Sequence, residues 1–246
     1  IRQKGLTSMN KADETIHEGL SPSRKRYFII DQIRGVAIVL MVFFHLFYDL
    51  TIFGAVSINF SKEPFWYFLP RVIVFLFLTA VGLSLSVVHE EKVQWKKFFP
   101  RLYKITLLAI CVSIMTWFMF PKAWVYFGTL HCIALCSLMA LPLLRFPKLA
   151  LFIALSLLIP SALFDKNLPW FTLSHASMDY ISPFPWFGVV CLGLFLKTKG
   201  FHTINLGHGK VLSALSLLGR HSLKIYILHQ PLLFGVLYLF FRVIKT

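Results

Sequence analysis

Several ionisable side chains in otherwise apolar stretches have the types and spacing that suit proton transfer. His45 and Asp49 are four residues apart, so on a helix they share one face, where the carboxylate can orient or charge the imidazole. A carboxylate and a histidine placed in this way form a general base pair. Because ionisable side chains are costly inside a bilayer, each one there is a candidate functional residue.

Two further histidines, His131 and His229, lie within other apolar stretches of the chain. A lone histidine on an apolar helix more often forms a hydrogen bond between helices than it takes part in catalysis. That interpretation applies to His131 and His229 more than to the pair of His45 and Asp49. On a helix, the eleven residues from Arg34 to His45 separate the two side chains by roughly 16 Å along the axis.

The stretches that carry these residues are long enough to cross a membrane. Of the 246 residues 57% are hydrophobic and 14% are charged, whereas soluble domains have roughly 25% charged residues, so a soluble protein is disfavoured. We predict an all-α, polytopic membrane bundle with about seven transmembrane helices, since a span needs ~20 apolar residues. The predicted spans are Ile33–Ile58, Phe65–Val88, Ile105–Phe120, Trp124–Leu144, Leu149–Phe164, Phe184–Leu196 and Leu223–Val243.

The positions of lysine and arginine predict the orientation of the bundle. Residues 1–26 contain no apolar run and are predicted to form a disordered cytoplasmic tail, followed by one transmembrane domain over 27–246. With the N-terminus in the cytoplasm, most basic residues of the short loops fall inside and the C-terminus falls outside. The net charge of +15 is then explained by topology and contact with the cytoplasmic leaflet, so no nucleic-acid partner is needed.

The first apolar stretch is predicted to be an uncleaved signal anchor, because Arg24, Lys25 and Arg26 directly precede a full-length span. Met9 stays open as the natural start, in which case residues 1–8 are an upstream extension. The four cysteines lie in apolar spans without the spacing of a zinc site or a disulfide framework. Cys132 and Cys136 share a helix face beside His131, which is a weak metal signal, and packing is the preferred interpretation.

Five segments occur in the order known from one family: Ile30–Met41 with Phe44 and His45, Phe75–Ser84, Tyr126–His131, Phe184–Gly188, and Gly219–Leu223 with His229–Pro231. Over about residues 28 to 240 they resemble the transmembrane acyltransferases related to heparan-alpha-glucosaminide N-acetyltransferase, and most closely the short bacterial members. The arginine and histidine of the first span also resemble bacterial membrane O-acyltransferases that decorate surface polysaccharides. The class of reaction is therefore better defined than the acceptor.

The resemblance implies that an acetyl group moves from cytoplasmic acetyl-CoA, a co-substrate, to an amine or hydroxyl at the outer face of the cell (inner) membrane. The expected acceptor is a glycan or an amino sugar. His45 would act as the general base or carry the acetyl group, and Asp49 would orient it. His131 and His229 would form hydrogen bonds with the thioester oxygen or the acceptor.

The charge layout of the chain suits this donor. At the basic inner face, Arg34, Arg220 and Lys224 are the residues expected to hold the anionic nucleotide end of acetyl-CoA. No metal is expected. The choice between N- and O-acetylation, between direct transfer and an acyl-histidine, and between monomer and homodimer stays open.

Two other functions are compatible with buried histidine and aspartate residues. A proton-coupled small-molecule transporter uses such residues as a relay, although the chain has no visible inverted repeat. A membrane scaffold uses them only to hold helices together. Binding of acetyl-CoA separates the acetyltransferase from both.

Overall fold

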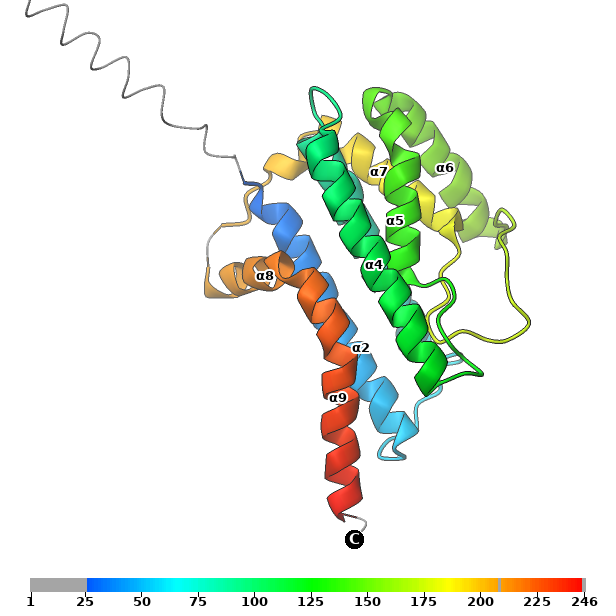
Figure 1. Cartoon of the computed structure of the whole chain (residues 1–246). Coiled ribbons are helices and arrows are strands. Elements are labelled where there is room, and N and C mark those ends of the chain that lie inside the picture. Colours follow the sequence, from blue (N-terminus) through cyan, green and yellow to red (C-terminus); the bar gives the residue numbers. More distant parts are fainter. Residues whose placement is uncertain (1–25, 208, 245–246) are drawn as a thin grey trace, which may run out of the picture.

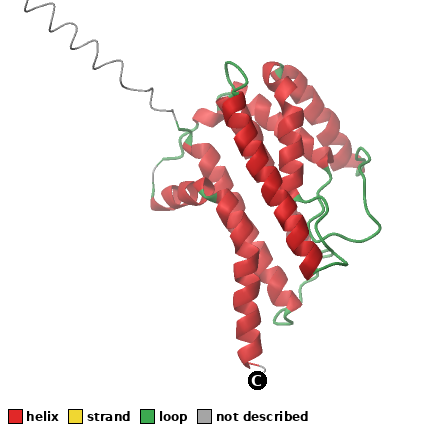
Figure 2. Ribbon diagram, in the orientation of Figure 1, coloured by secondary structure: helices red, strands yellow, loops and turns green. Residues whose placement is uncertain are grey.

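The computed structural model describes residues 26–207 and 209–244, and within these residues all regular secondary structure is helical, with loops between the helices (Figure 2). The elements are α2 (Phe28–Ile52), α3 (Pro64–Val88), α4 (Trp95–Met119), α5 (Thr129–Ala140), the short 3-10 helix η1 (Leu141–Arg145), α6 (Pro147–Phe164), α7 (Pro183–Thr198), η2 (Phe201–Thr203), α8 (Lys210–Arg220) and α9 (Ser222–Ile244). The predicted tail, apart from Arg26, lies outside the described residues, as does Met9.

The prediction of an all-α fold is confirmed for the described residues, but fewer helices than predicted have the length and hydropathy of a membrane span. In the described part of the chain, five helices are long and apolar enough to cross a membrane: α2, α3, α4, α6 and α9. The other two predicted spans are also apolar helices, but they are shorter and cover Thr129–Arg145 and Pro183–Thr198. The chain therefore has the helices of a multi-pass membrane protein, and seven crossings stay a prediction.

Several predicted boundaries are wrong by more than one helical turn. The first helix begins at Phe28 rather than Ile33 and ends at Ile52 rather than Ile58. Helix α4 begins at Trp95, ten residues before the predicted span. The prediction left these residues out because they are basic, but they form the first turns of the helix. Trp124 to Gly128 form a loop, so α5 begins five residues later than predicted.

Helix α3 joins two groups of helices. On one side it packs against α2, which in turn contacts α9, and on the other it packs against α7, which contacts α6. At the crossing of α3 and α7 the backbones approach so closely that a Cβ atom on Gly82 would lie 2.2 Å from the carbonyl oxygen of Val190. The main core lies among α3 to α7 and includes Leu78, Cys136 and Val190, each fully buried.

Helix α8, which the sequence analysis did not predict, lies across α2 (Figure 1). A Cβ atom on Gly35 of α2 would lie 2.0 Å from the carbonyl oxygen of Leu215, and one on Gly219 of α8 would lie 1.8 Å from that of Asp31. The two helices thus touch through their backbones at two glycines. Because α9 begins two residues after α8 ends, this contact also fixes where α9 starts.

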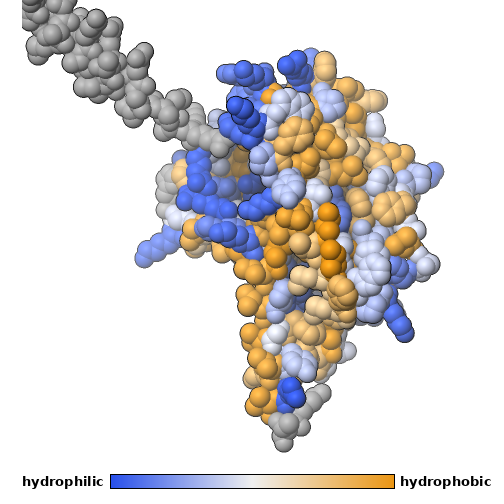
Figure 3. All heavy atoms as spheres, viewed as in Figure 1, coloured by the Kyte–Doolittle hydropathy of each residue, from blue (hydrophilic) through white to orange (hydrophobic). Residues whose placement is uncertain are grey.

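The surface separates into a polar end and an apolar side, as expected for a bundle in a bilayer (Figure 3). Hydrophilic residues gather around the start of α2 and over α8, whereas hydrophobic residues cover much of the side of the bundle. Helices α4, α6 and α9 expose large apolar side chains such as Phe118, Phe152 and Val236. We refer to the end that carries the start of α2 and the joint of α3 and α4 as the basic end. Its position in the cytoplasm stays a prediction.

The joint between α3 and α4 is closed by His89, whose side chain is 5% exposed. The backbone N–H of Gln94 donates a hydrogen bond to His89 Nδ1 over 3.0 Å. Burial lowers the pKa of His89 below its usual value, and the charges of Arg101 and Lys97 lower it further. The imidazole is therefore neutral at neutral pH, with its proton on Nε2.

This lowered pKa predicts a loss of stability in mild acid. Unfolded chains protonate histidine near pH 6.5, so below about this pH the unfolded state binds more protons than the folded state, and stability falls as the pH falls. We expect the Tm advantage of the wild type over His89→Gln to shrink by a few degrees between about pH 7 and about pH 5.5. A Tm difference that stays constant over this range contradicts the prediction.

Candidate active site

Two imidazoles meet where α2 and α9 pack together. The ring centroids of His45 and His229 are 4.8 Å apart, with 64° between the ring planes. His229 is 9% exposed, and its Nδ1 lies 2.7 Å from the carbonyl oxygen of Tyr226. A carbonyl only accepts hydrogen bonds, so Nδ1 carries the proton and Nε2 of the neutral ring holds a free lone pair. His229 is thus oriented as a proton acceptor that faces His45.

Asp49 lies one turn further along α2 and is fully buried. Its Oδ1 accepts a hydrogen bond of 2.8 Å from Nε2 of Gln230 on α9. We expected Asp49 to orient His45, but in the described part of the chain no hydrogen bond joins the two. The reason is that α9 places an amide donor beside the carboxylate and an imidazole beside His45. The partner that orients Asp49 is therefore Gln230.

Unpartnered polar atoms concentrate around this contact of α2 and α9. Buried atoms without a hydrogen-bond partner among the described residues include His45 Nδ1, Asp49 Oδ2, His229 Nε2 and Gln230 Oε1. Buried polar atoms are nearly always hydrogen-bonded in native proteins, so four unpartnered atoms on four neighbouring side chains indicate a site that binds a polar group. We call these four residues the His–Asp cluster.

His131 has a different environment from the His–Asp cluster. Its Nδ1 accepts a hydrogen bond of 3.2 Å from the backbone N–H of Gly128, which caps the start of α5. Its Nε2 lies 3.3 Å from Oγ of Ser113 on α4, and that hydroxyl donates to the carbonyl of Val125 over 2.6 Å. Since both ring nitrogens have partners, the geometry assigns His131 to holding α4 and α5 together rather than to contact with substrate.

A polar network connects the loop before α7 to α9. Asp179 accepts hydrogen bonds of 3.0 Å from both the backbone N–H and the hydroxyl of Thr129, at the positive end of the α5 dipole. Tyr226 donates its hydroxyl to the same carboxylate over 3.3 Å. Because the carbonyl of Tyr226 holds His229, Asp179 fixes the turn of α9 that presents the histidine.

The three predicted nucleotide-binding residues lie at the basic end, but on different sides of α2. Arg34 donates a hydrogen bond of 2.6 Å to Oγ of Ser84 on α3, and it forms an ion pair of 3.9 Å with Asp31. Arg220 instead lines a hollow of about 300 Å³ between α2 and α8. Lys224 is exposed in the first turn of α9. The structure therefore does not bring Arg34 and Arg220 into one cradle.

Among the residues that the structure describes, no three His, Cys, Asp or Glu side chains come together in a way that could hold a metal ion. The Sγ atoms of Cys132 and Cys136 are 3.7 Å apart in the core of α5. Both thiols are buried, and they pack against the apolar core.

Sequence reasoning missed Gln230, Tyr226 and the role of Asp179 in this site. Gln230 carries no charge, and Tyr226 is one aromatic residue among many in the apolar stretches. The spacing of Tyr226 and His229 could have indicated their contact, since Tyr226 lies three residues before His229 on the same helix face. Asp179 is charged, but charged residues near a membrane interface are usually solvated. In the structure, three hydrogen bonds engage its carboxylate.

Comparison with known protein families places most of the chain in a family. The family described as "Heparan-alpha-glucosaminide N-acetyltransferase, catalytic" matches residues 26–231, which include both histidines of the His–Asp cluster. No curated protein and no solved structure matches the chain.

Proposed function

The chain belongs to the heparan-alpha-glucosaminide N-acetyltransferase catalytic family, and from this premise we propose that it transfers an acetyl group from cytoplasmic acetyl-CoA to an amine or hydroxyl at the outer face of the membrane. The observation that carries the proposal is the His–Asp cluster between two apolar helices, where four buried polar atoms have no hydrogen-bond partner among the described residues. Such a site binds and reacts with a polar group in a place that excludes bulk water.

The chemistry needs a group that removes a proton from the acceptor as it attacks the thioester. A histidine with a free lone pair does this in the manner of a general base. The acceptor nitrogen or oxygen forms a bond to the thioester carbonyl, the carbon–sulfur bond breaks, and the thiolate of CoA takes back the proton. His45 is the base in this direct transfer. In the alternative with an acyl-histidine, a nitrogen of His45 attacks the thioester and the carbon–sulfur bond breaks. The acceptor then attacks the acetyl-imidazole, loses its proton to the thiolate of CoA, and frees the nitrogen of His45. His229 accepts or passes on the proton through Nε2.

Asp49 and Gln230 support this pair rather than react. The buried carboxylate provides negative charge close to the imidazoles, which stabilises an imidazolium while the proton is held there. Gln230 fixes the carboxylate by donating to Oδ1. The remaining oxygen, Oδ2, is free for the acceptor.

The layout along the bundle matches a donor that enters from the basic end. Arg34 lies there, eleven residues and roughly 16 Å from His45 along α2. The nucleotide end of acetyl-CoA is anionic and suits an arginine-rich entrance, while the thioester arm reaches the cluster.

We assign the basic end to the cytoplasm, residues 27–246 to one acyltransferase domain, and the protein to the inner membrane. A homodimer is compatible with this arrangement.

The acceptor is expected to be a glycan or an amino sugar that approaches from the opposite end. The loop between α6 and α7 lies at that end, where Trp170, Phe171 and Tyr126 pack together. Aromatic faces of this kind stack on sugar rings. Asp179 links this loop to α9 and thereby to His229.

The proposal is tested first by binding. Detergent-purified protein is expected to bind acetyl-CoA, to release CoA, and to transfer a labelled acetyl group to amino sugars. The buried histidine and aspartate residues also suit a proton-coupled transporter. If proteoliposomes take up a small molecule in a proton-coupled manner and the protein does not bind acetyl-CoA, the proposed acetyltransferase activity is overturned and the transporter is favoured.

A second test concerns Arg34. In Arg34→Ala we expect the affinity for CoA to fall about tenfold and the remaining binding to be less sensitive to salt, because a charge-assisted contact with phosphate is lost. Arg145→Ala, which removes an exposed arginine at the same end, is the matched control and is expected to bind as the wild type does. Unchanged affinity in Arg34→Ala assigns Arg34 to anchoring α2 through Ser84 and Asp31.

A further inference from the structure

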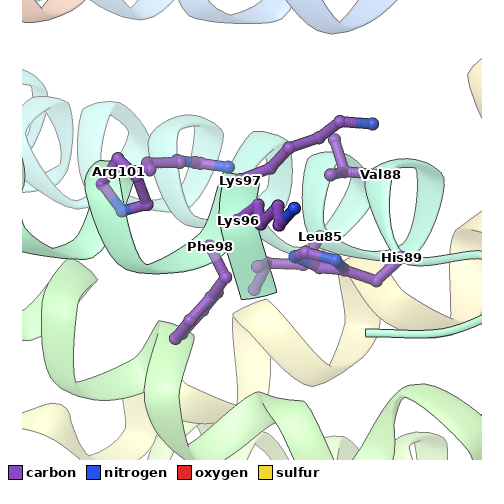
Figure 4. Close-up of a pocket in the computed structure, with 8 residues that line it drawn as sticks. Leu85, Val88, His89, Lys96, Lys97, Phe98 and Arg101 are labelled. Carbon is purple, nitrogen blue, oxygen red and sulfur yellow. The ribbon is translucent and has the colours of Figure 1, made fainter. Parts of the chain in front are cut away.

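A second hollow at the basic end has a composition that suits an anion. It measures about 330 Å³ and lies between the last turn of α3 and the first turns of α4 (Figure 4). Among the described residues, three cations and one imidazole line it over an apolar floor, and no carboxylate does: Lys96, Lys97, Arg101, His89, Leu85 and Phe98. None of the four polar residues was predicted as a binding residue.

Within the part of the chain that the structure describes, no carboxylate forms an ion pair with the cations of this hollow. Lys96 and Lys97 lie in the first turn of α4, where the helix dipole favours acidic residues and where α4 has none. In the described ranges 26–207 and 209–244, neither lysine nor Arg101 forms an ion pair. The nearby Glu90 is paired with Lys197 instead.

Two further contacts concentrate the charge. Arg34 on α2 is close enough to Arg101 for their charges to repel each other. Arg101 and Lys97 likewise place positive potential on His89. Like charges gathered in this way destabilise a protein unless an anion lies between them.

The donor set matches the oxygens of phosphate. Because Nδ1 of His89 accepts from Gln94, Nε2–H of the neutral ring is a hydrogen-bond donor. Arg101 adds a planar guanidinium that binds two oxygens, and the lysines add ammonium groups. Figure 4 shows these four side chains around one space between α3 and α4. The start of α4 contributes its positive dipole end.

We propose that this hollow is a binding site for a phosphate ester, held by Lys96, Lys97, Arg101 and Nε2–H of His89. Two sources share this chemistry: the nucleotide end of an acyl-CoA donor and the phosphate of an anionic lipid headgroup. The first source rests on the proposed function, and the second does not. The site differs from the predicted set of Arg34, Arg220 and Lys224, to which it is related only through Arg34.

The test compares three purified proteins: the wild type, Lys97→Gln/Arg101→Gln, and Lys104→Gln/Lys148→Gln. The last pair removes two charges from exposed positions at the same end but outside the hollow. Inorganic pyrophosphate is the first probe, measured by calorimetry. We expect its affinity to fall at least about tenfold in the first variant and to stay near the wild-type value in the second. Lys96→Gln, a single change at an exposed position, replaces the first variant if that variant does not fold.

The source of the phosphate follows from two further arms. If it is the donor, CoA loses affinity in parallel with pyrophosphate, and pyrophosphate competes with CoA. If it is a lipid, CoA binding is unchanged, and nanodiscs with dioleoylphosphatidic acid raise the Tm of the wild type but not of Lys97→Gln/Arg101→Gln. Either pattern supports the site.

Equal pyrophosphate affinity in all three proteins, with an equal Tm gain from phosphatidic acid, overturns the site. A failure of the proposed function has another signature: the wild type and the Lys104→Gln/Lys148→Gln variant do not bind CoA, while pyrophosphate still distinguishes the hollow variant from both. The two failures are therefore separable.

Discussion

Replacing His45 with alanine is expected to slow acetyl transfer by about 10²- to 10⁴-fold, the loss that follows removal of a general base. The substitution removes one of two imidazoles in contact at 4.8 Å and leaves His229 without the ring that it faces. Neither the basic end nor the hollow between α3 and α4 is altered. CoA affinity should therefore stay close to the wild-type value, and the loss should be in the transfer step. Transfer from labelled acetyl-CoA under single-turnover conditions measures that step.

Two comparisons make this result specific. Val39→Ala shortens an exposed side chain on the same helix and is expected to retain full transfer. His229→Ala is expected to cause a loss similar to that of His45→Ala, and the double variant should lose little more than either single one, because residues that act as a unit are not additive. Full transfer by folded His45→Ala removes His45 from the mechanism. Additive losses in the double variant contradict the shared role.

The membrane class and the existence of most helices followed from the sequence, because long apolar stretches dominate it and a bilayer leaves helices as the main choice. The boundaries followed less well. Helix α4 extends ten residues into a basic segment, since lysine and arginine are good helix formers at the edge of an apolar run. Helix α8 was missed because its eleven residues form a short amphipathic helix that contains no long apolar run.

The candidate site was predictable only in part. His45, Asp49 and His229 were found as ionisable residues in apolar stretches, and the structure does bring them together. Gln230 was not found, because an uncharged amide in a span gives no comparable signal, although it is the partner of Asp49. His131 was selected by the same rule as His229, yet its ring nitrogens are used within α4 and α5. Burial depth alone does not distinguish a bonded histidine from a free one.

The hollow between α3 and α4 illustrates another limit. Its three cations count in the sequence only as basic residues that set the orientation, because lysines near the end of a span usually have that role, and His89 carries no signal of its own. Their convergence depends on the tight joint at His89, which folds α4 back over the end of α3. A loop that sets topology and a loop that binds phosphate have the same composition. Only the packing separates them.

Gly219→Ala is expected to destabilise the protein by about 3 kcal/mol, with a fall in Tm of about 10 °C. The added Cβ atom would lie 1.8 Å from the carbonyl oxygen of Asp31, and backbone atoms cannot move aside as a flexible side chain can. Helix α8 must then shift away from α2, and α9 shifts with it because it begins two residues later. That movement separates His229 from His45. Transfer is therefore expected to fall even at temperatures at which the variant stays folded.

Gly235→Ala is the matched control, because it makes the same chemical change in a helix where the new Cβ atom meets nothing within 4 Å. Alanine is the better helix former by about 0.5–1 kcal/mol, so this variant should be as stable as the wild type or slightly more stable. Gly35→Ala, on the other side of the same crossing, should behave like Gly219→Ala, since its Cβ atom would lie 2.0 Å from the carbonyl oxygen of Leu215. Thermal unfolding of the three variants in one detergent tests the crossing. If Gly219→Ala and Gly35→Ala unfold at the temperature of Gly235→Ala, then α8 does not lie against α2 through these glycines, and the position of α9 must be fixed by its contacts with α2 alone.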